Sequence, residues 1–142
     1  MPTPSPTLSP VESQLQQAQV LLGRGAHREA LALARELESS VPENRDVLYV
    51  RAVAERYLGD FAAALTTLAR LESQHAGYGR LYQERGHCLR AQGATDAATE
   101  SYRRAVALNA ALPASWKALT ELHRFLSADQ RLRGRRDEAV PR

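Results

Sequence analysis

The sequence is poor in the residues that form disulfides and membrane spans. Cys88 is the only cysteine of the 142 residues, so an internal disulfide is excluded and nothing indicates an oxidising compartment. No apolar run approaches the roughly 18 residues that a membrane-spanning helix needs. The N-terminal segment MPTPSPTLSP has neither a basic region nor an apolar stretch, so it does not have the features of a secretory signal. We therefore predict a cytoplasmic protein with no membrane partner.

Positive charge is unevenly distributed along the chain. Lys117 is the only lysine, so nearly all cations are arginines. Residues 131–142 hold five arginines against Asp137 and Glu138, which equals the formal net charge of +3 of the whole chain. Such an end can attract nucleic acid or anionic lipid through its charge. Because two acids dilute the arginines, we predict a disordered Arg-rich tail over 127–142 and no nucleic-acid partner.

Composition also separates the N-terminal end from the rest. Residues 1–10 hold four of the seven prolines, with Ser and Thr between them, and this predicts a disordered leader. From residue 11 to residue 126, apolar residues recur at spacings of three and four, without the alternation that is typical of strands. Pro42 and Pro113 are the only prolines in this region. The sequence therefore predicts an all-α domain over 11–126.

A period of 34 residues runs through this domain without a gap, marked by Gly25, Gly59 and Gly93. Five residues after each glycine stands an alanine, and seven before each stands a small residue: Ala30, Ala64 and Ala98, and Ala18, Ala52 and Gly86. Glycine suits the positive φ that often ends a helix, and small residues let two helices cross closely. Each period thus predicts a helical hairpin, which must stack on the next to bury its apolar face.

These positions resemble the signature of the tetratricopeptide repeat family. The third copy is closest, with Tyr82, Gly86, Gly93, Ala98, Tyr102 and Ala105 at signature positions. The resemblance implies repeats over 11–44, 45–78 and 79–112 and a capping helix over 113–126, in which Trp116 takes the tryptophan position. The expected fold is an α-solenoid of three helix hairpins plus this C-terminal helix. Arg51 and Arg85 depart from the signature, since the family prefers leucine there.

The run from Tyr78 to Leu119 is also similar to the repeat region of bacterial proteins that join tetratricopeptide repeats to a C-terminal sulfotransferase domain. Such a domain needs a phosphate-binding loop between a strand and a helix, and the sequence contains none. This second resemblance implies a repeat domain of, or truncated from, such a protein, without the catalytic part. We predict that the chain itself is not an enzyme and binds no cofactor.

His87 and Cys88 stand side by side, like a metal-ligand pair or a thiol with its base. The residues equivalent to Cys88 in the other repeats are apolar: Val20, Ala54 and Leu122. Neighbouring side chains of a helix point about 100° apart, so His87 is not placed to act as a base for Cys88. No HxxH, HExxH or CxxC spacing occurs. We predict a buried Cys88, no metal site and no catalytic residue; a reactive thiol and a His87 metal ligand are the alternatives.

The resemblance implies that the first helix of each hairpin lines a concave groove that binds peptides. At the matching positions, the candidate peptide-binding residues are Tyr49, Val53, Arg56, Tyr57, Arg80, Gln83, His87, Arg90, Lys117 and Arg124. They form a cationic surface interleaved with aromatic residues, and arginine pairs well with carboxylates. We predict a scaffold or adaptor that binds an acidic peptide; the alternative for each arginine is a merely solvated helix surface.

Some family members clamp the C-terminal carboxylate of a chaperone peptide with lysine, asparagine and arginine. The matching positions here hold Leu15, Gln19, Val50, Arg80 and Glu84. Only Arg80 fits, so we predict that this clamp is absent. Because stacked repeats have apolar ends, we also predict that the solenoid ends can support homo-oligomers.

Overall fold

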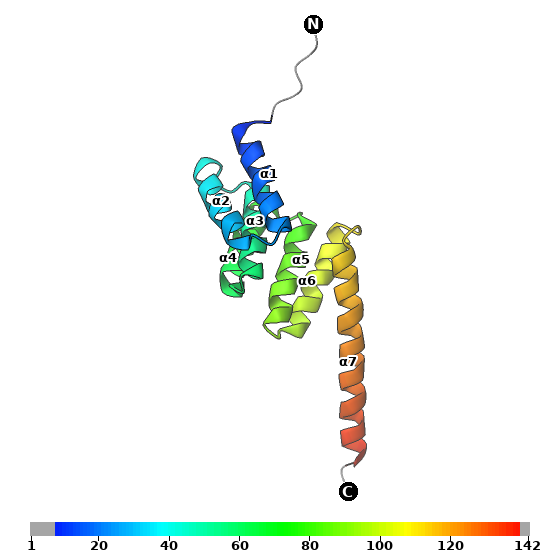
Figure 1. The fold of residues 1–142 in the computed structure, drawn as a ribbon. Helices are drawn as coiled ribbons and strands as arrows, with labels where there is room; N and C mark the ends of the chain where they lie inside the picture. Colours follow the sequence, from blue (N-terminus) through cyan, green and yellow to red (C-terminus); the bar gives the residue numbers. More distant parts are fainter. Residues whose placement is uncertain (1–7, 140–142) are drawn as a thin grey trace.

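The computed structural model describes residues 8–139 and contains helices joined by short loops, with no strand in that part of the chain. Consecutive helices pack against each other as three hairpins followed by one long helix (Figure 1). This confirms the predicted all-α architecture. The helices are α1 (Pro10–Gly23), α2 (His27–Ser40), α3 (Arg45–Tyr57), α4 (Phe61–His75), α5 (Gly79–Ala91), α6 (Thr95–Leu108) and α7 (Pro113–Ala139).

The periodic glycines take the two roles that their spacing predicts. Gly25, Gly59 and Gly93 follow the first helices with φ of +83°, +82° and +80°, a conformation that side chains with a Cβ rarely adopt. Gly86 lies instead at the crossing of α5 and α6. A Cβ atom there would come within 2.7 Å of the Tyr102 ring, so the hairpin closes only around a glycine.

The start of α1 corrects the boundary of the predicted leader. The Ser9 hydroxyl accepts a hydrogen bond from the Glu12 backbone N–H at 3.1 Å, and the Glu12 carboxylate accepts one from the Ser9 N–H at 3.1 Å. This reciprocal cap, with Pro10 at the first helical position, begins a stable helix. The predicted disordered leader 1–10 is therefore too long, because Ser9 and Pro10 belong to the start of α1. Residues 1–7 lie outside the described part.

The length of α7 corrects the prediction for the C-terminal end. The helix continues past residue 126 to Ala139, so the predicted disorder is wrong for residues 127–139, while 140–142 lie outside the described part. Nine of these 13 residues are leucine, alanine, arginine, glutamine or glutamate, which favour helix, and they outnumber Ser127, Asp129, Gly134 and Asp137, which do not. The Arg-rich composition predicts a disordered tail, but the same residues are compatible with the helix that is observed. In Figure 1, α7 extends far beyond the three hairpins.

The main core cluster lies between α3, α4 and α5 and includes Leu48, Leu68 and Leu81. Cys88 belongs to this cluster and is 0% exposed, which confirms that it is a packing residue. Burial raises the pKa of its thiol to about 11. Since only the thiolate is a good nucleophile, Cys88 is unreactive at neutral pH.

Arg51 and Arg85, the two departures from the repeat signature, form a repeated ion pair. Arg51 lies 2.6 Å from Glu38, and Arg85 lies 3.0 Å from Glu72. Each pair joins the first helix of one repeat to the second helix of the repeat before it. In the next repeat the same two positions hold Leu119 and Val106, so an apolar pair replaces the ion pair between α6 and α7.

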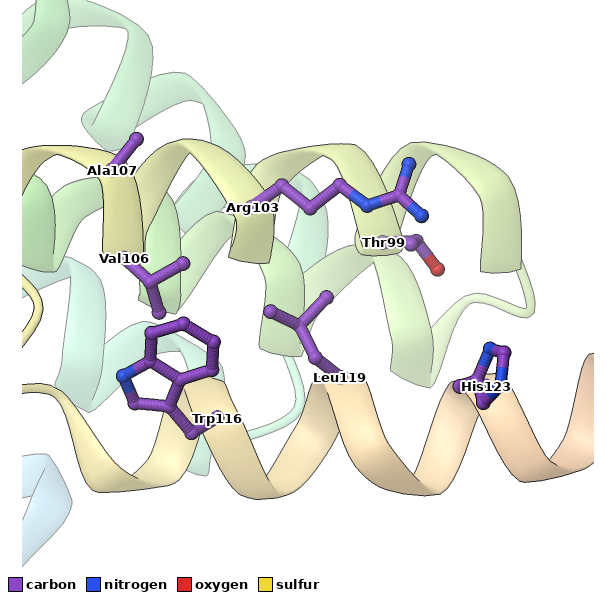
Figure 2. A pocket seen from close by; sticks show the side chains of 7 residues that line it. All are labelled: Thr99, Arg103, Val106, Ala107, Trp116, Leu119 and His123. Atoms are coloured by element: carbon purple, nitrogen blue, oxygen red, sulfur yellow. The ribbon is translucent and has the colours of Figure 1, made fainter.

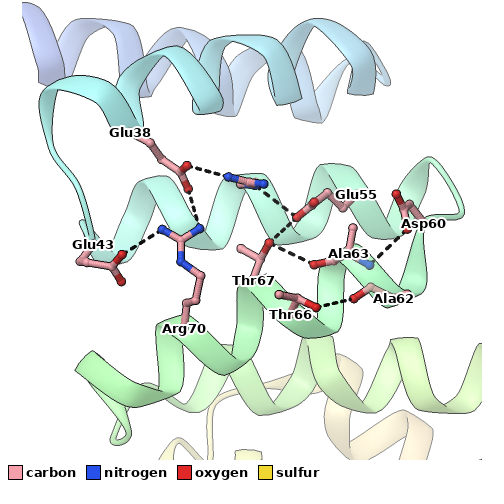
Figure 3. Close-up of polar contacts among 10 residues, drawn as sticks. Glu38, Glu43, Glu55, Asp60, Ala62, Ala63, Thr66, Thr67 and Arg70 are labelled. Atoms are coloured by element: carbon pink, nitrogen blue, oxygen red, sulfur yellow. Dashed lines mark hydrogen bonds and ion pairs between the residues drawn. The ribbon is translucent and has the colours of Figure 1, made fainter.

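The first of these pairs belongs to a polar network between α2, α3 and α4 (Figure 3). Glu55, only 1% exposed, accepts a hydrogen bond from the Thr67 hydroxyl at 2.6 Å, and its carboxylate lies 3.6 Å from the Arg51 guanidinium. Arg70 lies 2.9 Å from Glu43 and 3.6 Å from Glu38. Since a buried carboxylate is costly without partners, this network restricts how the first two hairpins can pack.

Candidate functional site

The predicted peptide-binding residues lie on α3, α5 and α7, and the first helices share one surface because α1 contacts α3 and α3 contacts α5. We call this surface the first-helix face. The structure brings its α5 and α7 parts together through two contacts: the Ser115 hydroxyl donates to the Gln83 side-chain oxygen at 2.8 Å, and Arg90 lies 2.9 Å from Glu121. Its members are Tyr49, Val53, Arg56, Tyr57, Arg80, Gln83, His87, Arg90, Lys117 and Arg124.

Arg56 is held by a buried carboxylate of the following repeat. Its Nε lies 2.5 Å from Glu84 Oε2, and its Nη2 lies 3.4 Å from Oε1. Glu84 is 3% exposed, and this burial raises the pKa of its carboxyl, while the charge of Arg56 opposes that shift. Glu84 therefore neutralises most of the charge that Arg56 was predicted to present to a ligand.

Tyr57 is presented at the surface in a fixed orientation. Its ring stacks on His27, with centroids 4.4 Å apart and an interplanar angle of 3°, and the Arg56 guanidinium lies 4.3 Å from its centroid. Such contacts hold an aromatic ring in place, yet Tyr57 remains 55% exposed. His27 was not among the predicted residues, because it stands at the start of a second helix, where the repeat signature marks no contact residue.

His87 contacts α6 and not its neighbour in the sequence. Its Nδ1 lies 2.6 Å from the Tyr102 hydroxyl oxygen, and the two rings meet edge to face. Burial, followed by the positive charges of Arg56 and Arg90, lowers the pKa of His87 to about 4. The imidazole is therefore neutral at pH 7 and adds no positive charge to the first-helix face.

Tyr49 and Val53 are less accessible than the sequence predicts. Val53 is only 5% exposed, so it offers little surface to a ligand. Tyr49 is half-buried and meets the Tyr78 ring edge to face, with centroids 5.6 Å apart. The Arg45 guanidinium lies 4.7 Å from the Tyr78 centroid. Neither Tyr78 nor Arg45 was predicted, because both lie at loop and helix ends outside the signature.

The remaining cations of the first-helix face differ in how they are paired. Arg80 and Arg124 are exposed and form no ion pair with any described residue. Arg90 pairs with the exposed Glu121, whose carboxylate also lies 3.9 Å from Lys117. A hydrogen bond from Arg90 lowers the pKa of Glu121. The first-helix face is therefore less positive than its composition suggests.

Two of the hollows that described residues line lie beside α7. The smaller, of about 200 Å³, lies where α5, α6 and α7 meet, and Arg90, Thr95, Glu121, Leu122 and Phe125 line it. Phe125 is 62% exposed there. The larger, of about 490 Å³, lies between α6 and α7 (Figure 2), and no candidate residue lines it. Trp116 could have indicated this second hollow, because Leu48 and Tyr82, at the same position of the preceding repeats, are buried.

No group of three or more histidine, cysteine, aspartate or glutamate side chains in residues 8–139 is arranged to hold a metal ion. Over the same residues, no helix is long and apolar enough to cross a membrane.

No model of a known protein family matches the sequence, and no curated protein matches it. Solved structures do match its shape. The Sgt2 TPR domain from Aspergillus fumigatus superposes with a TM-score of 0.78 at 18% identity, over 87% of this chain and 83% of that one. The chain has the fold of a tetratricopeptide repeat (TPR) domain.

Two further structural neighbours were solved with bound peptides. The first TPR of Spaghetti (RPAP3), bound to the HSP90 peptide SRMEEVD, has a TM-score of 0.74 at 20% identity, over 82% of this chain and 93% of that one. The Yersinia enterocolitica chaperone SycD, in complex with a peptide of the translocator YopD, has a TM-score of 0.71 at 15% identity, over 89% and 97%. Identities this low establish a shared fold only.

The structure also shows the surroundings of the residues at the positions of the chaperone-type carboxylate clamp. Leu15 and Val50 lie in the apolar cluster of α1, α2 and α3. Glu84 is paired with Arg56 and would repel a ligand carboxylate. Among the clamp positions, only the one held by Arg80 offers a cation, and Arg80 forms no ion pair with any described residue.

Proposed function

We propose that this chain is a protein-interaction module that binds an acidic peptide across its first-helix face. Exposed aromatic residues beside unpaired arginines carry the proposal. On the first-helix face, Tyr57 is 55% exposed, and Arg80 and Arg124 have no described acidic partner; Phe125, which lines a hollow with Arg90 next to that face, is 62% exposed. The peptides bound by the Spaghetti and SycD domains support peptide binding by this fold.

Charged and aromatic residues would contact different parts of the peptide. Arg80 and Arg124 would form charge-assisted hydrogen bonds with ligand carboxylates. Arg90 would exchange its exposed contact with Glu121 for a ligand carboxylate, since such surface pairs contribute little stability. Tyr57 and Phe125 would contact apolar side chains of the peptide, as aromatic residues commonly do at the centres of interfaces.

The peptide would be recognised along its length and not by its C-terminal carboxylate. Leu15 and Val50 offer no hydrogen bond, and the position of Glu84 carries the wrong charge for such an end. Arg56 would act indirectly, by holding the ring of Tyr57 in place.

A set of peptides with blocked termini tests this proposal. Each peptide places two to four glutamates beside one leucine, and affinity is measured by calorimetry at two salt concentrations. We expect affinity to rise with the number of glutamates and to fall with salt. The double variant Arg80→Glu/Arg124→Glu should lose this binding. The matched control Arg28→Glu/Arg35→Glu, with both changes on exposed positions of α2, should retain it. Equal affinity for all three proteins would refute the assignment of the first-helix face.

We further propose that the chain has no catalytic activity of its own, although part of it is similar to sulfotransferase-linked repeats. A sulfate-transfer assay on the purified protein should give no turnover, and measurable transfer would overturn this part of the proposal.

A further inference from the structure

The repeat register identifies a surface that lacks its usual cover. The fourth position of successive repeats holds Leu48, Tyr82 and Trp116. Leu48 is 0% exposed beside α4, and Tyr82 is 1% exposed with Arg104 of α6 over its ring. Trp116 is 50% exposed, because no described helix follows α7 to cover it. The second helix of a hairpin would occupy this place in a complete repeat.

The open surface is a groove with an apolar floor. Figure 2 shows Val106 of α6 beside the Trp116 ring at one end, with Leu119 of α7 between Trp116 and His123, which lies at the other end. At the preceding junction the same two positions hold Glu72 and Arg85, which form an ion pair. The volume of about 490 Å³ lies within the range of sites that bury a ligand.

The charge along the groove indicates what kind of helix would fit. Arg103 lines it, is exposed and forms no ion pair with the residues that the structure describes. Helix α7 itself carries six lysines and arginines against four acids. A second copy docking through α7 would therefore bring like charge toward Arg103, whereas an acidic helix would complement it.

We propose that the groove between α6 and α7 binds an amphipathic, acidic α-helix of a protein partner, in the place that α4 and α6 take on their own hairpins. Apolar residues of that helix cover Trp116, Val106 and Leu119, and a carboxylate pairs with Arg103. This site lies apart from the first-helix face, so either site can fail its test without affecting the other.

Trp116 makes the test specific, because it is the only tryptophan and lies in the groove. The probe is a helix-constrained peptide with the sequence of α6 carrying Arg103→Glu and Arg104→Glu; the control peptide keeps both arginines. We expect the acidic peptide to shift the Trp116 emission to shorter wavelength in a saturable way, as the indole becomes buried. The control peptide should bind more weakly.

Two protein variants locate the interaction. Arg103→Glu should weaken binding of the acidic peptide about fivefold, since an attraction between exposed charges becomes a repulsion. Arg35→Glu is the matched control: Arg35 is exposed on α2, at the same repeat position two periods earlier. This variant changes the net charge equally and should leave the affinity unchanged.

Several results would overturn the proposal. The absence of a saturable emission shift would do so, and so would calorimetric binding without such a shift, since the peptide would then lie elsewhere. If Arg103→Glu and Arg35→Glu weaken binding of the acidic peptide equally, the peptide responds to the net charge of the protein and not to the groove. A Trp116 emission that shifts with protein concentration, together with a dimer in sedimentation, would assign the groove to a second copy of the chain.

Discussion

The ion pair between Arg56 and Glu84 allows the most quantitative test of the packing between repeats. The Glu84 side chain is 4% exposed and that of Arg56 is 19%, so both charges are largely removed from water. Replacing Arg56 by alanine leaves a buried carboxylate without its partner, which typically costs about 3–5 kcal/mol. Loss of the contact with Tyr57 adds about 0.5–1 kcal/mol. Domains of this size have about 5–15 kcal/mol of stability, so Arg56→Ala should be severely destabilised.

The preceding repeat shows which apolar pair can replace this ion pair. One repeat earlier, the positions equivalent to Arg56 and Glu84 hold Leu22 and Val50, which pack together in an apolar cluster. We expect the double variant Arg56→Leu/Glu84→Val to lose no more than about 1 kcal/mol, because an apolar pair of similar volume often replaces a buried ion pair without loss. Urea denaturation followed by circular dichroism measures both variants.

The pH dependence separates charge from packing. Burial raises the pKa of Glu84 in the folded protein, and Arg56→Ala removes the charge that opposes this shift. A carboxyl with a raised folded pKa adds stability below its unfolded pKa of about 4.3, and this is lost as pH rises. Arg56→Ala should therefore lose much less stability at pH 4 than at pH 7. A loss below about 1 kcal/mol at pH 7, or an equal loss in the double variant, would refute the reasoning.

Three further predictions concern the hairpin of α5 and α6. Gly86→Ala should cost about 1–3 kcal/mol in urea denaturation, because its Cβ would overlap the Tyr102 ring, and a more stable variant would contradict the close crossing. The lowered pKa of His87 should stabilise the fold at pH values above its unfolded pKa of about 6.5, and this contribution should be lost as pH falls toward about 4. His87→Gln should therefore remove this pH dependence of the free energy of unfolding. If the His87 imidazole titrates near pH 6.5 by NMR, the lowered pKa is wrong. Cys88 should react with a thiol reagent at pH 8 only after urea unfolds the protein, so fast labelling of the native protein would contradict its burial.

Local features account for what the sequence predicted correctly. Glycine at a positive φ and small residues at a helix crossing act within one hairpin, so their spacing predicts the hairpins and places Cys88 in the core. Failures arose where local composition was ambiguous. Arginine-rich residues after 126 can form either a helix or a disordered segment, and only the structure shows that α7 continues to Ala139.

The candidate site was harder to predict, because charge depends on partners far apart in the sequence. Arg56 and Arg80 look alike as arginines on first helices. Yet Arg56 meets a buried carboxylate 28 residues further along the chain, while Arg80 meets no described acid. The groove between α6 and α7 was missed for a related reason. The repeat pattern places Trp116 correctly but does not report whether another helix covers it.

By itself, the 34-residue period determined that the chain forms stacked helical hairpins, because backbone conformation and close helix crossing depend on residues near in sequence. Only the tertiary structure decided which side chains remain available to a partner. Pairing and burial join side chains that are far apart in the sequence: Glu84 neutralises Arg56 of the preceding repeat, and within one hairpin the Tyr102 hydroxyl oxygen lies 2.6 Å from Nδ1 of His87. Because α7 is not followed by another described helix, Trp116 and Arg103 stay open between α6 and α7.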